Sequence, residues 1–131
     1  MILRAFPDVP VNRHLGFELR GSGAAGATVA MSPRAEHGQE YGVVHGGLLS
    51  ALADTAAVYT ILPGLADDER MTSIEFKVNF LAAAIPENGE IVATATMVRR
   101  GRTIAVVQSD VRQGDVHVLT GVFTYMIVTS R

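Results

Sequence analysis

The chain has 131 residues, with 11 Lys or Arg against 13 Asp or Glu and a formal net charge of −2 at pH 7. This length suits one compact domain, residues 1–131, with a sizeable core, and the weak negative charge gives no field to attract nucleic acid or an anionic membrane surface. Hydrophobic residues make up 48% of the chain, more than a lone small domain hides easily. Burial between subunits is therefore expected.

The absence of cysteine excludes disulfides, thiolate nucleophiles and cysteine-ligated zinc, and it fits a reducing, cytoplasmic location. The first ten residues contain two charges and two prolines and lack the apolar core of a signal peptide. The longest apolar segment is interrupted by Asp54 and closed by Pro63 and Gly64, so no membrane span is expected. The four histidines lack metal-site spacing, and we expect neither a metal nor any other cofactor.

The N-terminal third predicts a short arm and a hairpin. Two prolines limit residues 1–14 to one or two helical turns, and residues 17–20 and 27–32 are strand-like. The intervening GSGAAG fits the glycine spacing of a dinucleotide-binding loop. Such a loop needs a helix directly after it, whereas a strand follows here, so we interpret the glycines as a hairpin connection.

Residues 48–62 carry apolar side chains on every side of a 3.6-residue helix, which predicts a buried helix. Its one carboxylate is Asp54, and a carboxylate is rarely buried unless it is paired or used. Around this acid, small residues follow one another at helical spacing and leave room for a ligand or a neighbouring subunit. These are Gly47, Ser50, Ala57 and Val58.

After residue 64 the period of the pattern changes from helical to alternating. Residues 73–80 predict a half-buried strand with Ile74, Phe76, Val78 and Phe80 on one face. Residues 90–99, 103–112 and 116–128 are β-branched runs joined by hairpins. The pattern as a whole predicts an α+β domain in which an antiparallel sheet curls around a single helix.

Two segments carry a resemblance to a known family. QEYGVVHGG at residues 39–47, followed by Leu52-Ala53-Asp54, resembles the hotdog-fold acyl-CoA thioesterases of the phenylacetic-acid-degradation type, related to 4-hydroxybenzoyl-CoA thioesterases. TSIEFKVNFL at residues 72–81 resembles their second motif. The resemblance implies a hotdog fold and hydrolysis of an acyl-CoA or aryl-acyl-CoA to free acid and CoA, with CoA as part of the substrate rather than a cofactor.

The same resemblance implies that sheets of two subunits join edge to edge, as a homodimer or as a dimer of dimers forming a homotetramer. The catalytic site would then straddle the dimer, with Asp54 and Ser73 of one site coming from different subunits. Two rival interpretations remain open. One is a hotdog dehydratase or hydratase, although the proline-glycine turn before the acid is missing, and the other is a non-catalytic acyl-CoA-binding protein.

Gly46 and Gly47 begin the predicted helix, where backbone N–H groups lack partners and the helix dipole is positive, so they are suited to polarise a thioester carbonyl. Glycines that merely allow close helix packing are the alternative. Asp54 is suited to attack the thioester or to activate water, and the alternative is a structural acid. The resemblance implies a catalytic Asp54.

The remaining candidates are supporting residues. We expect His45 to cap the helix start. By resemblance Gln39 would lie beside the substrate carbonyl and the water, unless it is an ordinary loop residue, and Ser73 would help to hold the water. Val58 and Tyr59 are expected near the acyl group, whose identity the sequence leaves open. Three residues of one hairpin are either simply solvated or bind the phosphates of CoA: Arg99, Gly101 and Arg102.

Overall fold

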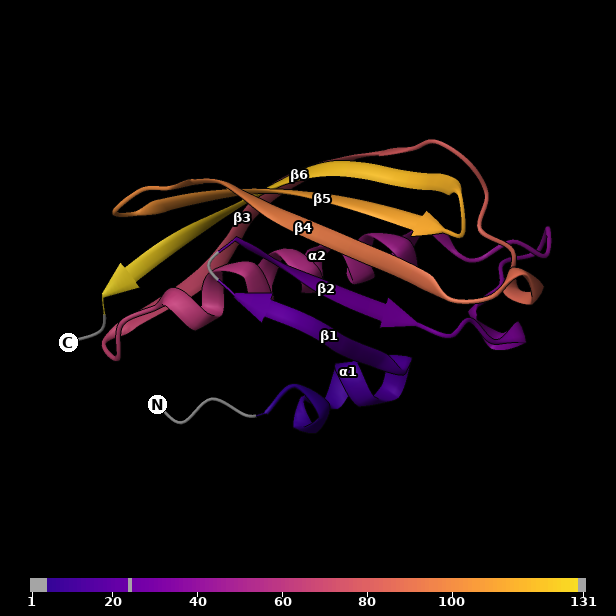
Figure 1. Ribbon diagram of the computed structural model, residues 1–131, viewed down its shortest axis with the longest axis horizontal. Helices are drawn as coiled ribbons and strands as arrows, with labels where there is room; N and C mark the ends of the chain where they lie inside the picture. The colour runs from indigo at the N-terminus through magenta and orange to yellow at the C-terminus, as the bar shows by residue number, and fades with distance from the viewer. Residues whose placement is uncertain (1–4, 24, 130–131) are drawn as a thin grey trace.

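The computed structural model describes residues 5–23 and 25–129. Its six strands form one antiparallel sheet in the order β1-β2-β4-β5-β6-β3 (Figure 1). This order leaves β1 and β3 at the two edges and joins β4, β5 and β6 by successive hairpins, as the sequence predicts. The strands are β1 (Phe17–Gly23), β2 (Gly26–Met31), β3 (Glu69–Phe80), β4 (Ile91–Arg100), β5 (Ile104–Gln113) and β6 (Val116–Thr129).

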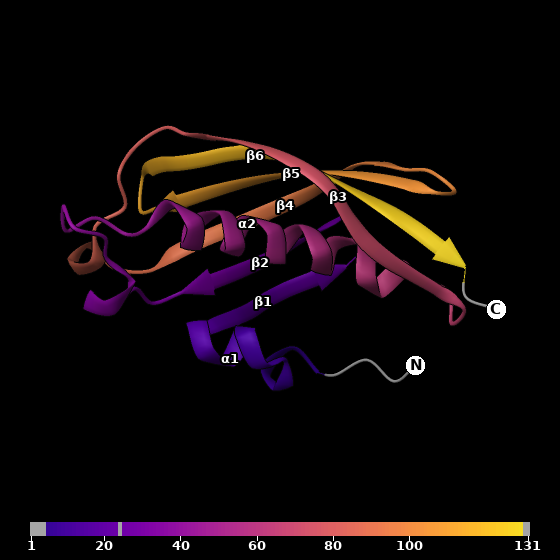
Figure 2. The same cartoon turned by 180° about the vertical axis from the view of Figure 1, so that it is seen from behind.

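One long helix, α2 (Gly46–Ile61), lies against the sheet, which curves over it (Figures 1 and 2). The helix packs mainly on β2, β4 and β5, and its side chains toward them are small or aliphatic. The predicted α+β architecture, a curved antiparallel sheet wrapped around one central helix, is therefore confirmed. The buried residues of α2 are Leu49, Leu52, Ala53, Ala56, Ala57, Thr60 and Ile61.

The sheet covers only one side of α2, so the prediction of a helix buried all round is wrong for the single chain. Ser50, Asp54, Val58 and Tyr59 remain partly exposed on the other side. Together with the short η3 (Leu62–Gly64), the helix is apolar and long enough to cross a membrane by length and composition alone. In this fold the same apolar character serves packing against the sheet.

Strand β3 differs from its prediction as a half-buried strand. It lies at the sheet edge and has little contact with α2, and Ile74, Phe76 and Phe80 are 47%, 50% and 56% exposed. A β-bulge between Ser73 and Glu75 shifts the register, after which Phe76 lies opposite Phe123 and stacks on its ring at 5.1 Å. Only Met71 and Val78 of the described β3 residues pack against the core cluster, so the core reaches this strand in part.

The N-terminal arm and the first hairpin agree with their predictions over the described residues, residues 1–4 and 24 lying outside them. The arm consists of η1 (Phe6–Asp8) and α1 (Pro10–Leu15), and the Phe6 ring contacts Tyr59 edge-on at 4.7 Å. The β1–β2 hairpin needs its last glycine because a Cβ on Gly26 would lie 2.1 Å from the Ala95 carbonyl oxygen. Gly26 thus serves strand packing, whereas a Cβ on Gly21 or Gly23 would meet no atom within 4 Å.

Two buried polar side chains under the sheet differ in hydrogen bonding. Gln113 accepts from the Ile85 N–H at 2.9 Å and donates to the carbonyl oxygens of Ile85 and Gly89 at 2.7 and 2.8 Å. It thereby fixes the loop around η4 (Pro86–Asn88). Ser109, fully buried on the helix-facing side of β5, has a hydroxyl without a hydrogen-bond partner in the described chain.

These two residues give a stability prediction. Ser109→Ala should leave the free energy of unfolding unchanged or raise it by about 1 kcal/mol, because it removes a buried hydroxyl that gains nothing from the fold. Gln113→Leu should lower it by about 2–3 kcal/mol, because it leaves backbone groups of Ile85 and Gly89 unpaired. Urea unfolding of both variants beside the parent measures the difference, and a Ser109→Ala loss as large as that of Gln113→Leu would contradict it.

Candidate active site

The start of α2 presents one backbone donor without a partner. His45 is the N-cap, and its Nδ1 accepts from the Gly47 N–H at 2.9 Å, which confirms the predicted capping role. The N–H groups of Leu48 and Leu49 donate to the His45 carbonyl at 3.0 and 3.4 Å. Within the described residues the Gly46 N–H has no acceptor. The donor free to bind a ligand oxygen at the positive end of the helix is therefore Gly46.

A pocket of about 360 Å³ opens beside this donor. The structure brings Gly46 and the predicted Gln39 together in its wall, and the Phe80 ring lies so close that a Cβ on Gly46 would meet it at 3.1 Å. Apart from Gln39 and the backbone, the wall is apolar. The remaining residues lining the pocket are Val43, Val44, Leu49, Leu81, Ala82, Ala83 and Ala84.

The Gln39 side chain is held by its own loop. Its Oε1 accepts from the Tyr41 N–H, while its backbone N–H donates to the Val43 carbonyl at 2.8 Å and its carbonyl accepts from Gly42 at 2.9 Å. Gly42 closes this turn with a left-handed φ of 79°. The amide nitrogen remains as the part of Gln39 able to reach a substrate, so Gln39 can donate there while its oxygen is engaged.

Asp54 lies in the middle of α2 on the partly exposed side, and its partner comes from β6. The Tyr125 hydroxyl donates to Asp54 Oδ1 and also lies 3.4 Å from the Asp54 carbonyl oxygen. Burial raises the pKa of the Asp54 carboxyl, and the hydrogen bond from Tyr125 acts in the opposite direction. Within the described residues nothing donates to Oδ2. One carboxylate oxygen is thus fixed and the other is available for chemistry.

Sequence reasoning missed Tyr125, although a signal for it exists. Tyr125 stands among apolar residues on the inward face of β6 and is 1% exposed, and a buried tyrosine hydroxyl usually finds a polar partner. Asp54 was the only acid predicted in the core. Burial and the neighbouring carboxylate both raise the pKa of Tyr125, so the phenol stays protonated and remains a donor.

Ser73 lies next to this pair within the same chain. Its Cα is the cross-strand partner of Tyr125, so both side chains stand on the helix-facing side of the sheet. Within one chain the β3–β6 register places Ser73 opposite Tyr125. That Ser73 and Asp54 of one site come from different subunits stays a prediction. We call Asp54, Ser73 and Tyr125 the carboxylate half-site.

Gly46 and Asp54 are not brought together in one chain. They are eight residues apart on a continuous helix, which at 1.5 Å per residue separates them by about 12 Å. A single thioester carbonyl contacts both only if they come from different copies. We call Gln39, His45 and Gly46 the helix-start half-site. The chain thus holds two half-sites at different points along α2.

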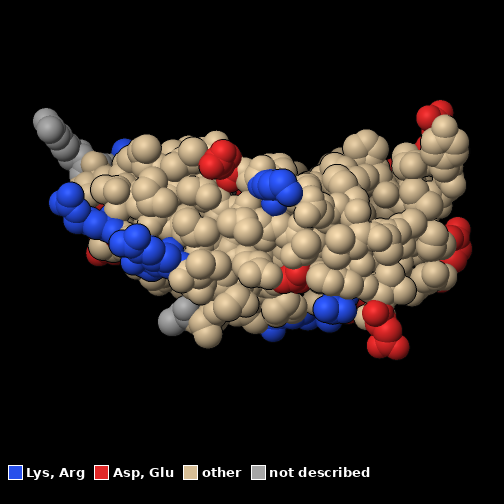
Figure 3. All heavy atoms as spheres, turned by 90° about the horizontal axis from the view of Figure 1, so that it is seen from above, with Lys and Arg blue, Asp and Glu red and all other residues tan. Residues whose placement is uncertain are grey.

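The β4–β5 hairpin gathers the predicted arginines. Arg99, Gly101 and Arg102 line a pocket of about 300 Å³, together with Thr103, Ile104 and Val106. Within the described chain neither Arg99 nor Arg102 forms an ion pair. Lys and Arg side chains crowd the end of the molecule where this hairpin lies (Figure 3). The hairpin therefore offers two guanidinium groups to an anionic ligand.

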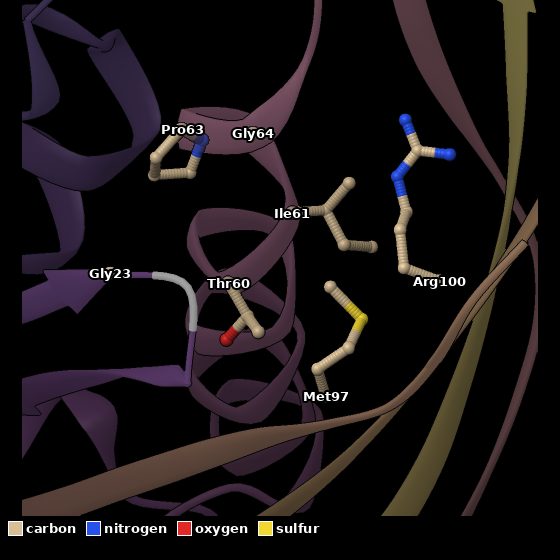
Figure 4. A pocket seen from close by; sticks show the side chains of 7 residues that line it. All are labelled: Gly23, Thr60, Ile61, Pro63, Gly64, Met97 and Arg100. Atoms are coloured by element: carbon tan, nitrogen blue, oxygen red, sulfur yellow. The ribbon is translucent and has the colours of Figure 1, made fainter.

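A third pocket, of about 330 Å³, lies at the opposite end of α2 from Gly46 (Figure 4). Thr60, Ile61, Met97 and Arg100 line it, and Arg100 donates to Glu69 Oε1 at 3.1 Å. The predicted acyl-contacting Val58 and Tyr59 line none of these three pockets. Val58 packs against the core cluster, and the Tyr59 ring contacts Phe6 of the arm.

Comparison with known proteins places this geometry in a family. A family model described as the thioesterase superfamily matches residues 41–120. A Haemophilus influenzae protein with a provisional esterase name is 31% identical over 99 residues, which cover 76% of this chain and 70% of that protein. The chain therefore belongs to the thioesterase superfamily.

Two solved structures agree with this assignment. A thioesterase from Haemophilus influenzae superposes with a TM-score of 0.86 at 25% identity, covering 94% of this chain and 85% of that one. A phenylacetic acid degradation-related protein from Ralstonia eutropha gives a TM-score of 0.85 at 24% identity, covering 92% of this chain and 91% of that one, a likeness of fold alone. The protein is a thioester hydrolase with the hotdog fold.

The raised pKa of Asp54 gives a pH prediction. If ionised Asp54 is needed, kcat/KM for the best thioester substrate should fall as the pH drops through that pKa. The acid limb should therefore have its midpoint above about 3.9, the ordinary value for Asp. Steady-state rates between pH 3.5 and 8 measure it. An acid limb whose midpoint lies at or below the ordinary pKa of Asp would count against an essential, partly buried carboxylate.

Proposed function

We propose that the protein hydrolyses an acyl-CoA, including aryl-acyl-CoA, to the free acid and CoA. The observation that carries this proposal is the partly exposed Asp54 carboxylate, which has one oxygen bonded to Tyr125 and, within the described residues, no donor to the other. A structural acid would use both oxygens within the fold. The half-used carboxylate favours a catalytic role over the structural alternative.

In the proposed reaction the thioester carbonyl oxygen accepts a hydrogen bond from the Gly46 N–H, with the Gln39 amide as a second donor. Both donors stabilise the negative charge that develops on that oxygen. Asp54 Oδ2 either takes a proton from water, whose oxygen forms the new C–O bond, or attacks the carbonyl carbon itself to form an anhydride that water then hydrolyses. In both routes the C–S bond breaks and the CoA sulfur leaves and is protonated.

A second copy of the chain supplies the missing half of each site in this proposal. The unpaired β3 edge carries exposed Ile74, Phe76 and Phe80, and an apolar edge of this kind favours pairing with another strand. Pairing β3 with β3 of a second copy by a two-fold axis would set the two α2 helices antiparallel. Ser50, midway between Gly46 and Asp54, is small enough to allow their close approach. Each Gly46 would then face the Asp54 of the other copy.

The antiparallel arrangement also supports a role for the arginine hairpin. In one chain the hairpin lies toward the C-terminal end of α2 (Figure 1). In the proposed dimer the hairpin of the second copy would lie toward the Gly46 end, where Arg99 and Arg102 are suited to bind the phosphates of CoA. Exposed side chains on the outer face of β6 support further association into a dimer of dimers: Val122, Met126 and Val128.

The first test replaces the acid by its near-isosteric amide. Asp54→Asn should lower kcat by roughly 10²-fold or more, because it removes both the base and the nucleophile, while KM changes little. The variant should fold at least as well as the parent at neutral pH, because it removes the cost of ionising a partly buried carboxyl. The measurement is hydrolysis of a panel of short, long and aromatic acyl-CoAs, with thermal melts.

Ser50→Ala is the matched control on the same helix face and should stay near the parent rate. A folded Asp54→Asn protein that hydrolyses its best acyl-CoA at near the parent rate would make Asp54 structural and the proposed mechanism wrong. The panel also identifies the acyl class, because the best substrate is the one that the parent hydrolyses with the highest kcat/KM.

The second test asks whether the site is shared. Asp54→Asn and Gly46→Ala each damage both sites of a homodimer, whereas a heterodimer of the two variants regains one intact site. Mixed and reassembled in equal amounts, they should recover about a quarter of the parent activity, since about half the dimers are mixed and each has one good site. Light scattering reports assembly. A folded monomer at micromolar concentration, or a mixture no more active than its parts, would contradict the shared site.

A further inference from the structure

The Tyr125 hydroxyl occupies a fixed position under the sheet. Its strand, β6, lies between β3 and β5, and the Cα partners of Tyr125 on those strands are Ser73 and Ala105. The side chain is 1% exposed, so the ring has no freedom to swing into solvent. Its hydroxyl contacts only Asp54 within the described residues, at the carboxylate and at the backbone carbonyl.

This contact restrains the one torsion on which the chemistry of Asp54 depends. A carboxylate rotates about its terminal bond with little preference, so a solvated Asp exchanges its two oxygens freely. A phenol on a rigid strand that donates to Oδ1 ends this exchange and directs Oδ2 to the uncovered side of α2. The same phenol donates to the charged form of the acid and so favours ionisation.

Among residues 5–23 and 25–129, no charged side chain acts on Asp54 as Tyr125 does. The strands packed on α2 turn apolar or neutral side chains toward it, including Ala93 and Ala95 of β4 and Ala105, Val107 and Ser109 of β5. The charged pair closest to the C-terminal end of α2, Arg100 and Glu69, is engaged in its own ion pair. Burial and the Tyr125 hydrogen bond are the causes that act on the pKa of Asp54.

We propose that Tyr125 is the positioning residue of the carboxylate half-site. Its hydroxyl holds Oδ1 of Asp54, so that the carboxyl group is ionised and Oδ2 is oriented for the reaction. The inference rests on the proposed catalytic role of Asp54. A merely structural tyrosine would satisfy its own hydroxyl and support the core. A positioning tyrosine also sets the pH at which the enzyme becomes active and the rate at which bound substrate reacts.

The test removes only the hydroxyl. Tyr125→Phe should lower kcat at neutral pH by about tenfold, with KM nearly unchanged, because the bound substrate then meets a carboxylate that is free to rotate. The acid limb of kcat/KM should also move upward by about one pH unit, because the charged form of Asp54 loses its donor. Tyr41→Phe removes a phenol hydroxyl from an exposed loop tip and should reproduce the parent profile.

A second variant decides the question if Tyr125→Phe does not fold. Site-specific 3-fluorotyrosine at position 125 keeps the ring and the hydroxyl but makes the phenol a stronger donor. The acid limb should then move downward, opposite to the shift of the phenylalanine variant. A structural role predicts no shift for either folded variant.

The outcome also separates this inference from the proposed function. Asp54→Asn measured alongside should abolish the acid limb, and adding Tyr125→Phe to it should lower kcat no further. If Asp54→Asn is inactive while both Tyr125 variants show the parent kcat and acid limb, the positioning role is wrong and the proposed reaction stands. If Asp54→Asn retains the parent rate, the proposed reaction fails and the positioning role fails with it.

Discussion

Helix α2 is apolar on nearly all sides, and one curved sheet covers only part of it. The sheet buries the face that contains Leu52, Ala53 and Ala56, while Ser50, Asp54 and Val58 stay partly open. Apolar surface left open by one chain favours association with another. The exposed phenyl rings of β3 lie at the sheet edge next to this opening. Association with a second chain would therefore cover both the open side of the helix and the unpaired strand.

This constraint explains why the acid sits where it does. On the sheet-facing side of α2, Asp54 would lose all hydration and would be held neutral by burial. On a fully solvated side, it would be an ordinary surface carboxylate far from any donor that polarises a substrate. The partly open side gives it an intermediate environment, in which burial raises its pKa while one oxygen remains accessible. The separation of about 12 Å from Gly46 is the reason why the proposed site takes its other half from a second subunit.

Local patterns predicted most of the architecture, because the periodicity of a helix or a strand depends on residues that are close together in the sequence. The helix start at His45 and Gly46, the β4–β5 and β5–β6 hairpins and the α+β fold are confirmed. Burial of β3 was mispredicted, because an alternating pattern does not say whether its apolar face meets its own chain or another. The contact of the Tyr59 ring with Phe6 was not predicted, because it joins residues 53 apart in the sequence and no local pattern contains it.

The site residues that could be predicted were likewise those whose partners are close in the sequence. Gln39, His45 and Gly46 lie within one short segment, and the structure keeps them together at the helix start. The Arg99 to Arg102 hairpin was likewise found from its own sequence. The partner of Asp54 was missed, because Tyr125 is 71 residues away and its hydroxyl meets the acid only once the sheet has folded over α2.

The chemical identity of that partner matters for the proposed reaction. An arginine beside Asp54 would also stabilise the ionised acid. Its guanidinium would, however, form hydrogen bonds to both carboxylate oxygens and make them weaker as base or nucleophile. A tyrosine donates one hydrogen bond to one oxygen and leaves the net charge of the acid unchanged. Burial raises the pKa of the phenol, so it gives no proton away at working pH. A neutral donor therefore makes burial of the acid compatible with the reactivity that the proposed reaction requires.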